Sequence, residues 1–222
     1  MPVDLEMHGA TALITMNDGK ANAVNPTFIA AFNAALDRAA APDVEAVILT
    51  GQPGRFSAGF DLKYFQSEGP EATAALVKEG GRLAHRLFGF EKPLIAAVSG
   101  HAIAMGCFLA QCCDARIGIA GDFKIGANET AINMVLPEFA HQLLIARVRP
   151  DRLTEAAIFA QLFTPHEAVE VGYLDQVVDP GALMDAATAK AQVLAELPGA
   201  SYAGNKALVR GKALRVMEES LA

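Results

Sequence analysis

The sequence predicts an α/β fold made of one core domain and a helical appendage. Short apolar runs rich in β-branched residues recur along the chain, and segments with helical apolar spacing separate them. Such continuous apolar strands are typical of a sheet that helices bury on both faces. With 222 residues, 52% of them hydrophobic and 19% charged, the chain has enough apolar side chains for one sizeable core.

The first predicted unit is a strand, a helix and a second strand. ATALITMN (10–17) and VEAVILTG (44–51) are β-branched apolar runs closed by turn residues, which is typical of buried strands. The intervening segment, 26–41, carries apolar residues at helical spacing, and Asn25 precedes it as a candidate N-cap. The apolar positions of this helix are Phe28, Ile29, Phe32, Ala35 and Leu36.

The next segment repeats the alternation. We expect a helix over 72–90 and a strand in PLIAAVSG (93–100). A helix of small residues follows in GCFLAQCC (106–113), and then a strand in ARIGIA (115–120).

The remainder of the chain is predicted to be mostly helical. Helices are expected over about 138–148 and 151–161 and again over 181–222, whereas YLDQVVD (173–179) is either a strand or an extended connection. We therefore divide the chain into an α/β core, 1–180, which carries the functional site, and a helical segment, 181–222, for packing and oligomerisation.

Composition and charge exclude several classes of function. No apolar run approaches the roughly 20 residues that a membrane span requires. A net charge of −7 disfavours nucleic acid as a partner, because phosphate neutralisation needs a basic face. The first residues lack the features of a signal or transit peptide and the last, EESLA, are not a peroxisomal signal, so a cytoplasmic location is expected.

The three cysteines are predicted to be buried and reduced. Cys107, Cys112 and Cys113 are odd in number, closely spaced and embedded in apolar sequence. This pattern fits neither a disulfide framework nor a paired zinc-binding motif. We therefore expect no metal site.

Two glycine-containing stretches follow predicted strands and begin helices. In GRFSAGFDLKYF (54–65), small residues precede a helix opened by Asp61, and in SGHAIAMGCFLA (99–110), Gly100 ends a strand and Gly106 allows close approach. Backbone N–H groups at a helix N-terminus are unpaired and can bind developing negative charge. Two such donors converging on one oxygen would form an oxyanion hole. Either stretch alone is more often structural than functional.

Together and in this order, the motifs are far more specific. FSAGFDLK, KPLIAAVSGHAIAMGCFLA, CDARIGIA and IGANE resemble those of the crotonase superfamily, the enoyl-CoA hydratase and isomerase fold, over about 10–200. The resemblance implies a spiral of ββα units, assembly as a homotrimer or hexamer, and an acyl-CoA thioester substrate in lipid metabolism, with no cofactor beyond the coenzyme A of that substrate. It also implies that the thioester oxygen accepts hydrogen bonds from the amides of Phe60 and Met105.

The chain departs from the family pattern at both of these positions. Phe60 stands where the family often has Ala, and Met105 where it often has Gly. A backbone donor survives a side-chain change if the dihedral angles are tolerated, and the larger side chains should narrow the acyl pocket. The alternative is that both are ordinary core-packing residues.

The acid-base residues discriminate between activities. In the hydratases of this family two glutamates hold a water, but Phe108 takes the place of the first of them, in GCFLA, and only Glu129 remains. A single carboxylate suits an isomerase that takes a proton from C2 of a 3-enoyl-CoA and returns it to C4. We expect Ile132, Met134 and Phe108 to desolvate Glu129 and raise its pKa. IGANETAINMVLP also resembles the mitochondrial-type Δ3,Δ2-enoyl-CoA isomerase, and the alternative for Glu129 is a surface or capping acid.

Further residues at the family's motif positions are expected to contact the substrate. Glu138 either borders the pocket, where it would revive hydration, or opens the next helix as a first-turn acid. Lys20 and Lys63 are expected near the nucleotide of coenzyme A, with Lys206 a weaker candidate. The remaining expected contacts are Ala58, Asp61, Leu62, Gly106, Phe108 and Met134.

Three functions therefore remain. The first is an enoyl-CoA isomerase with Glu129 as the only acid-base group. The second is an enoyl-CoA hydratase, or another lyase or thioester hydrolase of the same superfamily. The third is a protein that binds CoA thioesters without efficient catalysis.

Overall fold

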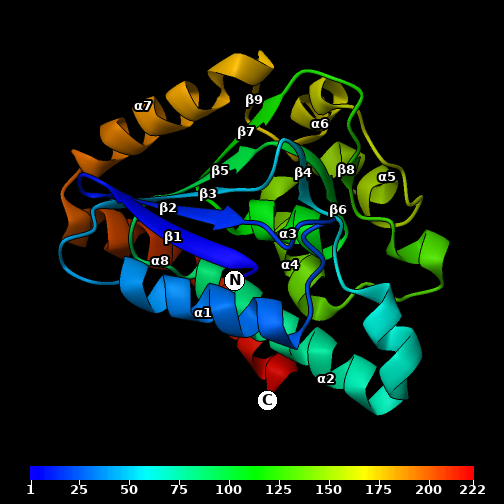
Figure 1. The fold of residues 1–222 in the computed structure, drawn as a ribbon. Helices are drawn as coiled ribbons and strands as arrows, with labels where there is room; N and C mark the ends of the chain where they lie inside the picture. Colours follow the sequence, from blue (N-terminus) through cyan, green and yellow to red (C-terminus); the bar gives the residue numbers. More distant parts are fainter.

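The computed structural model describes residues 1–222, and it is built around a six-stranded sheet (Figure 1). The strand order is β1-β2-β3-β5-β7-β9, in which β1 and β2 form an antiparallel hairpin and all other neighbours are parallel. The strands are β1 (Val3–His8), β2 (Thr11–Met16), β3 (Ala46–Thr50), β5 (Leu94–Val98), β7 (Ala115–Ile119) and β9 (Gln176–Val178).

A second, three-stranded parallel sheet lies beside the first. It contains β4 (Gly54–Ser57), β6 (Gly100–Ile103) and β8 (Ile125–Gly126) in that order. After the β1-β2-α1 unit, successive turns of the chain supply one strand to each sheet and then a helix, as in β3-β4-α2 and β5-β6-α3. This repetition confirms the predicted α/β spiral of ββα units.

Eight α-helices surround the sheets. They are α1 (Pro26–Ala39), α2 (Leu62–Phe88), α3 (Met105–Cys112), α4 (Glu138–Arg147), α5 (Leu153–Ala157), α6 (Pro165–Val171), α7 (Leu183–Ala195) and α8 (Gly199–Leu221). Three single 3₁₀ turns, η1 (Glu129–Ile132), η2 (Pro150–Arg152) and η3 (Pro180–Ala182), connect some of them. None of the helices combines the length and the apolar character that crossing a bilayer requires.

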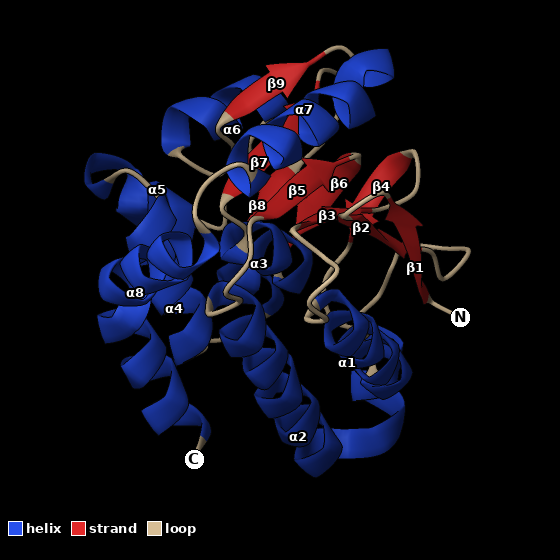
Figure 2. Ribbon diagram, turned by 90° about the vertical axis from the view of Figure 1, so that its left-hand side faces the viewer, coloured by secondary structure: helices blue, strands red, loops and turns tan.

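The central strands bury both of their faces. Val47 and Leu49 of β3 belong to the larger core, which β3 shares with α1, α2 and α3, whereas Ala46 and Ile48 face a smaller cluster. Helix α7 completes that smaller cluster, and Figure 2 shows α7 on the side of the sheet opposite to α1 and α2. The C-terminal helix α8 packs against α2 and α4 and contributes Met217 to the larger core.

Several local predictions are confirmed. Asn25 caps α1, because its side chain accepts a hydrogen bond from the Phe28 amide at 3.0 Å and Pro26 occupies the first helical position. All three cysteines are buried and free. YLDQVVD contains a strand, β9.

Other boundaries differ from the prediction. The helix that Asp61 was predicted to open and the helix predicted over 72–90 are joined in one element, α2, which Asp61 caps and which is broken at Gly69 and Pro70. The expected helix over 151–161 is reduced to a 3₁₀ turn and the five-residue α5, and the helical C-terminus is split into α7 and α8 at Leu197 and Pro198. Elements not predicted at all are β1, β4, β6, β8 and α6.

Candidate active site

The two glycine-containing loops meet at one end of the small sheet. Strands β4 and β6 pair in parallel, so the segments that follow them lie side by side. A Cβ atom on Gly59 would stand 3.2 Å from the Met105 nitrogen and 2.9 Å from the Ile103 oxygen, and a Cβ on Gly106 would stand 2.2 Å from the Ser57 oxygen. Only glycine permits these approaches, so the two loops are in direct contact.

The amides of Phe60 and Met105 are both free of protein acceptors. The Gly59 carbonyl and the Asp61 amide hydrogen-bond with Val24, at 2.8 and 3.0 Å, so the Phe60 amide between them faces the opposite side of the strand. Met105 is the first residue of α3, where a backbone N–H has no intrahelical acceptor. The structure therefore leaves both predicted donors available to an external oxygen.

Ala104, directly before Met105, holds an unusual backbone conformation. Its φ of 51° and ψ of −126° lie outside the regions that a residue with a side chain ordinarily adopts. Its amide donates to the Gly126 carbonyl at 2.9 Å, which ties this turn to β8. Strained residues of this kind cluster at functional sites, where the surrounding structure enforces them.

Next to this turn lies an apolar cavity of about 60 Å³. Two polar residues line it, Glu129 at the start of η1 and Asn128 directly before it. The other lining residues are apolar: Ala58, Phe60, Leu62, Phe65, Ile103, Ala104, Phe108, Ile132, Met134, Pro137 and Phe139. Glu129 is therefore the only ionisable side chain in the cavity.

Asn128 and Glu129 each have a buried side-chain oxygen without a hydrogen-bond partner. Glu129 Oε2 and Asn128 Oδ1 are the only buried side-chain oxygen or nitrogen atoms in the chain that have no hydrogen-bond partner. Leaving a buried polar atom unpaired costs about 1–3 kcal/mol, so a protein rarely retains two side by side without a function. Both atoms lie at the cavity, which makes it the candidate active site.

Burial also changes the acidity of Glu129. The side chain is only 6% exposed, and loss of solvation raises its pKa from 4.5 to about 7, against the opposing effect of the nearby Glu129 and Asn128 amides. A carboxylate with this pKa exchanges protons readily near neutral pH.

Phe108 lies in the same cavity and is almost fully buried. Its ring meets that of Phe139 edge to face, with centroids 6.1 Å apart and planes at 89°. The place that a second glutamate would take is thus occupied by an aromatic ring that is locked by its neighbour.

The Phe60 ring lines the cavity, and it is held in place by close packing on Gly80, a residue that the sequence analysis did not identify. Phe60 packs on Phe65, with centroids 5.7 Å apart, and over Gly80 in α2, where a Cβ atom would stand 2.5 Å from Phe60 Cζ. Gly81 leaves similar room for Phe139 and Leu221. A glycine pair inside a helical pattern is the signal that could have indicated this close packing.

Besides Lys20 and Lys63, three residues predicted to contact substrate do not line the cavity. Asp61 accepts from the Lys63 and Tyr64 amides as the cap of α2, and Gly106 serves the contact between the loops. Glu138 also lies outside, because it begins α4 and its carboxylate accepts a 2.7 Å hydrogen bond from Gln142 and lies 3.4 Å from His141. Glu138 is therefore the first-turn acid of α4, the second of its two predicted roles, whereas contacts of Asp61 and Gly106 with the substrate stay predictions.

The lysines divide into two groups. Lys20 and Lys63 are exposed and their ammonium groups have no protein partner, so both remain candidates for binding phosphate groups. Lys206 is different, because its side chain is only 7% exposed and bonds to Asp114 and to the carbonyls of Phe90 and Lys92. The Lys206 ammonium therefore has no free donor for a phosphate group, which disfavours this weaker candidate. No group of three or more His, Cys, Asp or Glu side chains is placed to hold a metal ion.

Comparison with known proteins agrees with this geometry. The family model described as enoyl-CoA hydratase/isomerase matches residues 6–222. The chain belongs to this family. It is thus an enzyme of the enoyl-CoA hydratase/isomerase family, with the fold that the sequence motifs predicted.

Individual relatives include both kinds of enzyme. The mitochondrial enoyl-CoA delta isomerase 1 of Mus musculus is 30% identical over 179 residues, which are 79% of this chain but only 62% of the mouse protein. The short-chain-enoyl-CoA hydratase of Clostridium acetobutylicum is 31% identical over 94% of this chain and 81% of its own. Among solved structures, a Mycobacterium tuberculosis protein described as an enoyl-CoA isomerase has a TM-score of 0.94 and 34% identity, covering 99% of this chain and 96% of that chain, and a second structure of the same protein is described as a probable enoyl-CoA hydratase.

Proposed function

We propose that this member of the enoyl-CoA hydratase/isomerase family is an isomerase that converts a 3-enoyl-CoA to a trans-2-enoyl-CoA. The observation that carries the proposal is a single unpaired carboxylate, Glu129, in a cavity whose other lining residues are apolar apart from Asn128. Moving a double bond by one position requires one group that removes a proton and returns it, and no water enters the product.

In the proposed reaction Glu129 acts on two carbon atoms in turn. The ionised carboxylate takes a proton from C2, and the electron pair of that C–H bond moves into a dienolate that extends to the thioester oxygen. The amides of Phe60 and Met105 stabilise the charge on that oxygen. Protonated Glu129 then donates the same proton to C4, which restores the thioester carbonyl and leaves the double bond between C2 and C3.

The properties of Glu129 suit both steps. With a pKa of about 7, the carboxylate is half ionised near neutral pH. Both its ionised form, which removes a proton, and its protonated form, which returns one, are therefore well populated. Phe108, Ile132 and Met134 line the cavity with apolar side chains, which should limit exchange of the proton with water during transfer.

Hydration is the second candidate, and the hydratases among the relatives support it. Adding water across a double bond calls for a second group that orients the water. Phe108 cannot do so, and Glu138 lies outside the cavity with its carboxylate bound to Gln142. For these reasons the site favours proton transfer between carbons.

Two parallel assays test the proposal. The purified protein is incubated with 3-hexenoyl-CoA and separately with trans-2-hexenoyl-CoA, and the absorbance of the conjugated 2-enoyl thioester is followed. The isomerase proposal predicts a gain of absorbance with the first substrate and no loss with the second. Loss of absorbance with the second substrate, accompanied by 3-hydroxyacyl-CoA in the product, would replace isomerisation with hydration. Binding of both compounds without conversion would favour a protein that only binds CoA thioesters.

A further inference from the structure

A second cavity lies at the opposite end of the main sheet from the active site. Its volume is about 380 Å³, and it shares no lining residue with the active-site cavity. Asp114 lies directly before β7 and accepts a 2.8 Å hydrogen bond from the Leu94 amide at the start of β5. The chain reaches the active-site residues only beyond the other ends of these strands, after β6 and β8 of the small sheet, so the two sites lie toward opposite ends of β5 and β7.

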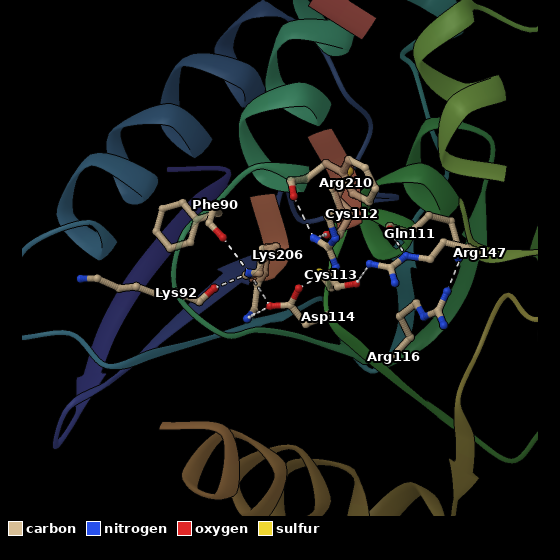
Figure 3. Close-up of polar contacts among 12 residues, drawn as sticks. Phe90, Lys92, Gln111, Cys112, Cys113, Asp114, Arg116, Arg147, Lys206 and Arg210 are labelled. Atoms are coloured by element: carbon tan, nitrogen blue, oxygen red, sulfur yellow. Dashed lines mark hydrogen bonds and ion pairs between the residues drawn. The ribbon is translucent and has the colours of Figure 1, made fainter. Parts of the chain in front are cut away.

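Positive charge dominates this cavity. Figure 3 shows Lys206 and Arg210 converging on Asp114, at 2.7 and 2.6 Å, with Arg147 beside them. All four side chains line the cavity, so three cations meet one carboxylate. Asp114 is already shared between two of them, and an excess of two positive charges remains.

Arg147 is the cation without a carboxylate partner. Its Nε donates to the Gln111 carbonyl at 3.0 Å and its Nη2 to the Cys113 carbonyl at 2.6 Å. Burial lowers its pKa to about 10, and repulsion from Arg210 and Arg116 adds to the effect. Both Arg147 and Arg210 also lie over the ring of Phe88, at 5.6 and 4.4 Å from its centroid, which is a favourable contact for a cation.

The cavity lining also contains polar groups that have no hydrogen-bond partner in the protein. Ser201 and Asn205 stand one turn apart on α8, are exposed, and make no side-chain hydrogen bond. The Arg147 Nη1 group likewise has no acceptor, whereas the Lys206 ammonium is fully occupied by three acceptors. Guanidinium, hydroxyl and amide donors at the edge of a cationic cavity are the groups that bind an oxyanion.

We propose that this cavity binds a small dianion, a phosphate or dicarboxylate, held by Arg147 with Ser201 and Asn205. Two negative charges balance the excess of two positive charges on the lining. The site is separate from the candidate active site and does not depend on the reaction proposed above.

Isothermal titration calorimetry with inorganic phosphate, and separately with succinate, tests the site at constant ionic strength. The wild-type protein should bind at least one of these anions saturably, with one site per chain. Binding of phosphate alone identifies a phosphoryl ligand, and binding of succinate alone identifies a carboxylate ligand. Absence of saturable binding for both anions would overturn the proposal.

Three variants locate the binding. Asn205→Asp places a negative charge at the cavity without removing a structural hydrogen bond, and should weaken binding on the order of tenfold. Gln192→Glu adds the same charge on the exposed face of α7, away from the cavity, and should leave binding unchanged. Lys63→Gln tests the active-site end of the chain and should also have no effect. Equal binding by Asn205→Asp and wild type, or loss of binding in Lys63→Gln, would contradict the assignment.

Discussion

The ring of Phe60 lies over Gly80 so closely that a Cβ atom at Gly80 would stand 2.5 Å from Phe60 Cζ. The residue that supplies one of the two proposed oxyanion donors is therefore positioned by a glycine in the middle of α2. Glycine in a helix interior is about 1 kcal/mol less favourable than alanine, so its presence here is explained by close packing.

Gly80→Ala should therefore disturb the active site in spite of its better helix propensity. The Phe60 ring must shift, and we expect a loss of about 1–3 kcal/mol in the free energy of unfolding together with reduced turnover. Urea denaturation and the 3-enoyl-CoA assay measure both effects. Gly204→Ala is the matched control, because a Cβ there meets no atom within 4 Å, and it should stabilise α8. Adding Phe60→Leu to Gly80→Ala should restore stability; failure to do so would show that the contact is not the cause.

Glu129→Gln should stabilise the protein in a pH-dependent way. Burial raises the folded-state pKa of Glu129 from 4.5 to about 7, so the folded state binds the proton more tightly than the unfolded state. The proton on Glu129 therefore contributes fully to the free energy of unfolding of the wild type below pH 4.5. This contribution is lost as the pH rises from 4.5 to about 7. The variant avoids this loss, so its advantage in unfolding free energy should grow from near zero at pH 4.5 to about 3 kcal/mol at pH 8. A constant difference across this range would contradict the burial of the carboxylate.

The same shift in pKa predicts the pH dependence of catalysis. Glu129 must be ionised to remove a proton, so kcat/KM should rise with pH and level off above an apparent pKa near 7. Initial rates measured from pH 5 to 9 give this profile. A midpoint near 4.5 would mean that Glu129 is solvated in the free enzyme.

Isotope transfer distinguishes a shielded carboxylate from an open one. With 3-enoyl-CoA deuterated at C2, part of the label should appear at C4 of the product, because the apolar cavity slows exchange of the abstracted proton with water. Mass spectrometry and NMR of the product locate the label. Complete loss of deuterium to solvent would contradict the shielding that Phe108, Ile132 and Met134 are proposed to provide.

Asp114→Ala should be strongly destabilising. It leaves Lys206 and Arg210 buried without a counter-charge, and we expect the free energy of unfolding to fall by about 3–5 kcal/mol. Asp43→Ala breaks an exposed ion pair with Arg38 and serves as the control, for which little change is expected. Similar midpoints of urea unfolding for both variants would contradict a structural role for Asp114.

Local patterns in the sequence were sufficient to predict the chemical core of the site. Glu129, Phe108 and the loops ending at Phe60 and Met105 follow one another at characteristic intervals, and the structure brings them to one place. Strands β3, β5 and β7 were equally clear, because every one of their residues is buried and their apolar runs are continuous.

The features that the sequence could not predict depend on contacts between distant residues or on the direction in which a side chain points. Lys206 bonds to Asp114, 92 positions away, and no local pattern reveals that pair. The side chain of Glu138 turns outward because Gln142, one helical turn later, holds it there. Strands β4 and β6 are short and contain turn-forming glycines, so they were interpreted as loops.

The central claim is that one carboxylate, Glu129, carries out the whole acid-base chemistry. Its most direct test is the single-turnover rate of Glu129→Gln with 3-hexenoyl-CoA, compared with Glu138→Gln, which changes a carboxylate outside the cavity. The proposed mechanism predicts that the single-turnover rate of Glu129→Gln falls by about 10²–10⁴-fold while CoA-thioester binding is retained. The rate of Glu138→Gln should be unchanged. A rate in Glu129→Gln close to that of the wild type, or an equal loss in Glu138→Gln, would contradict it.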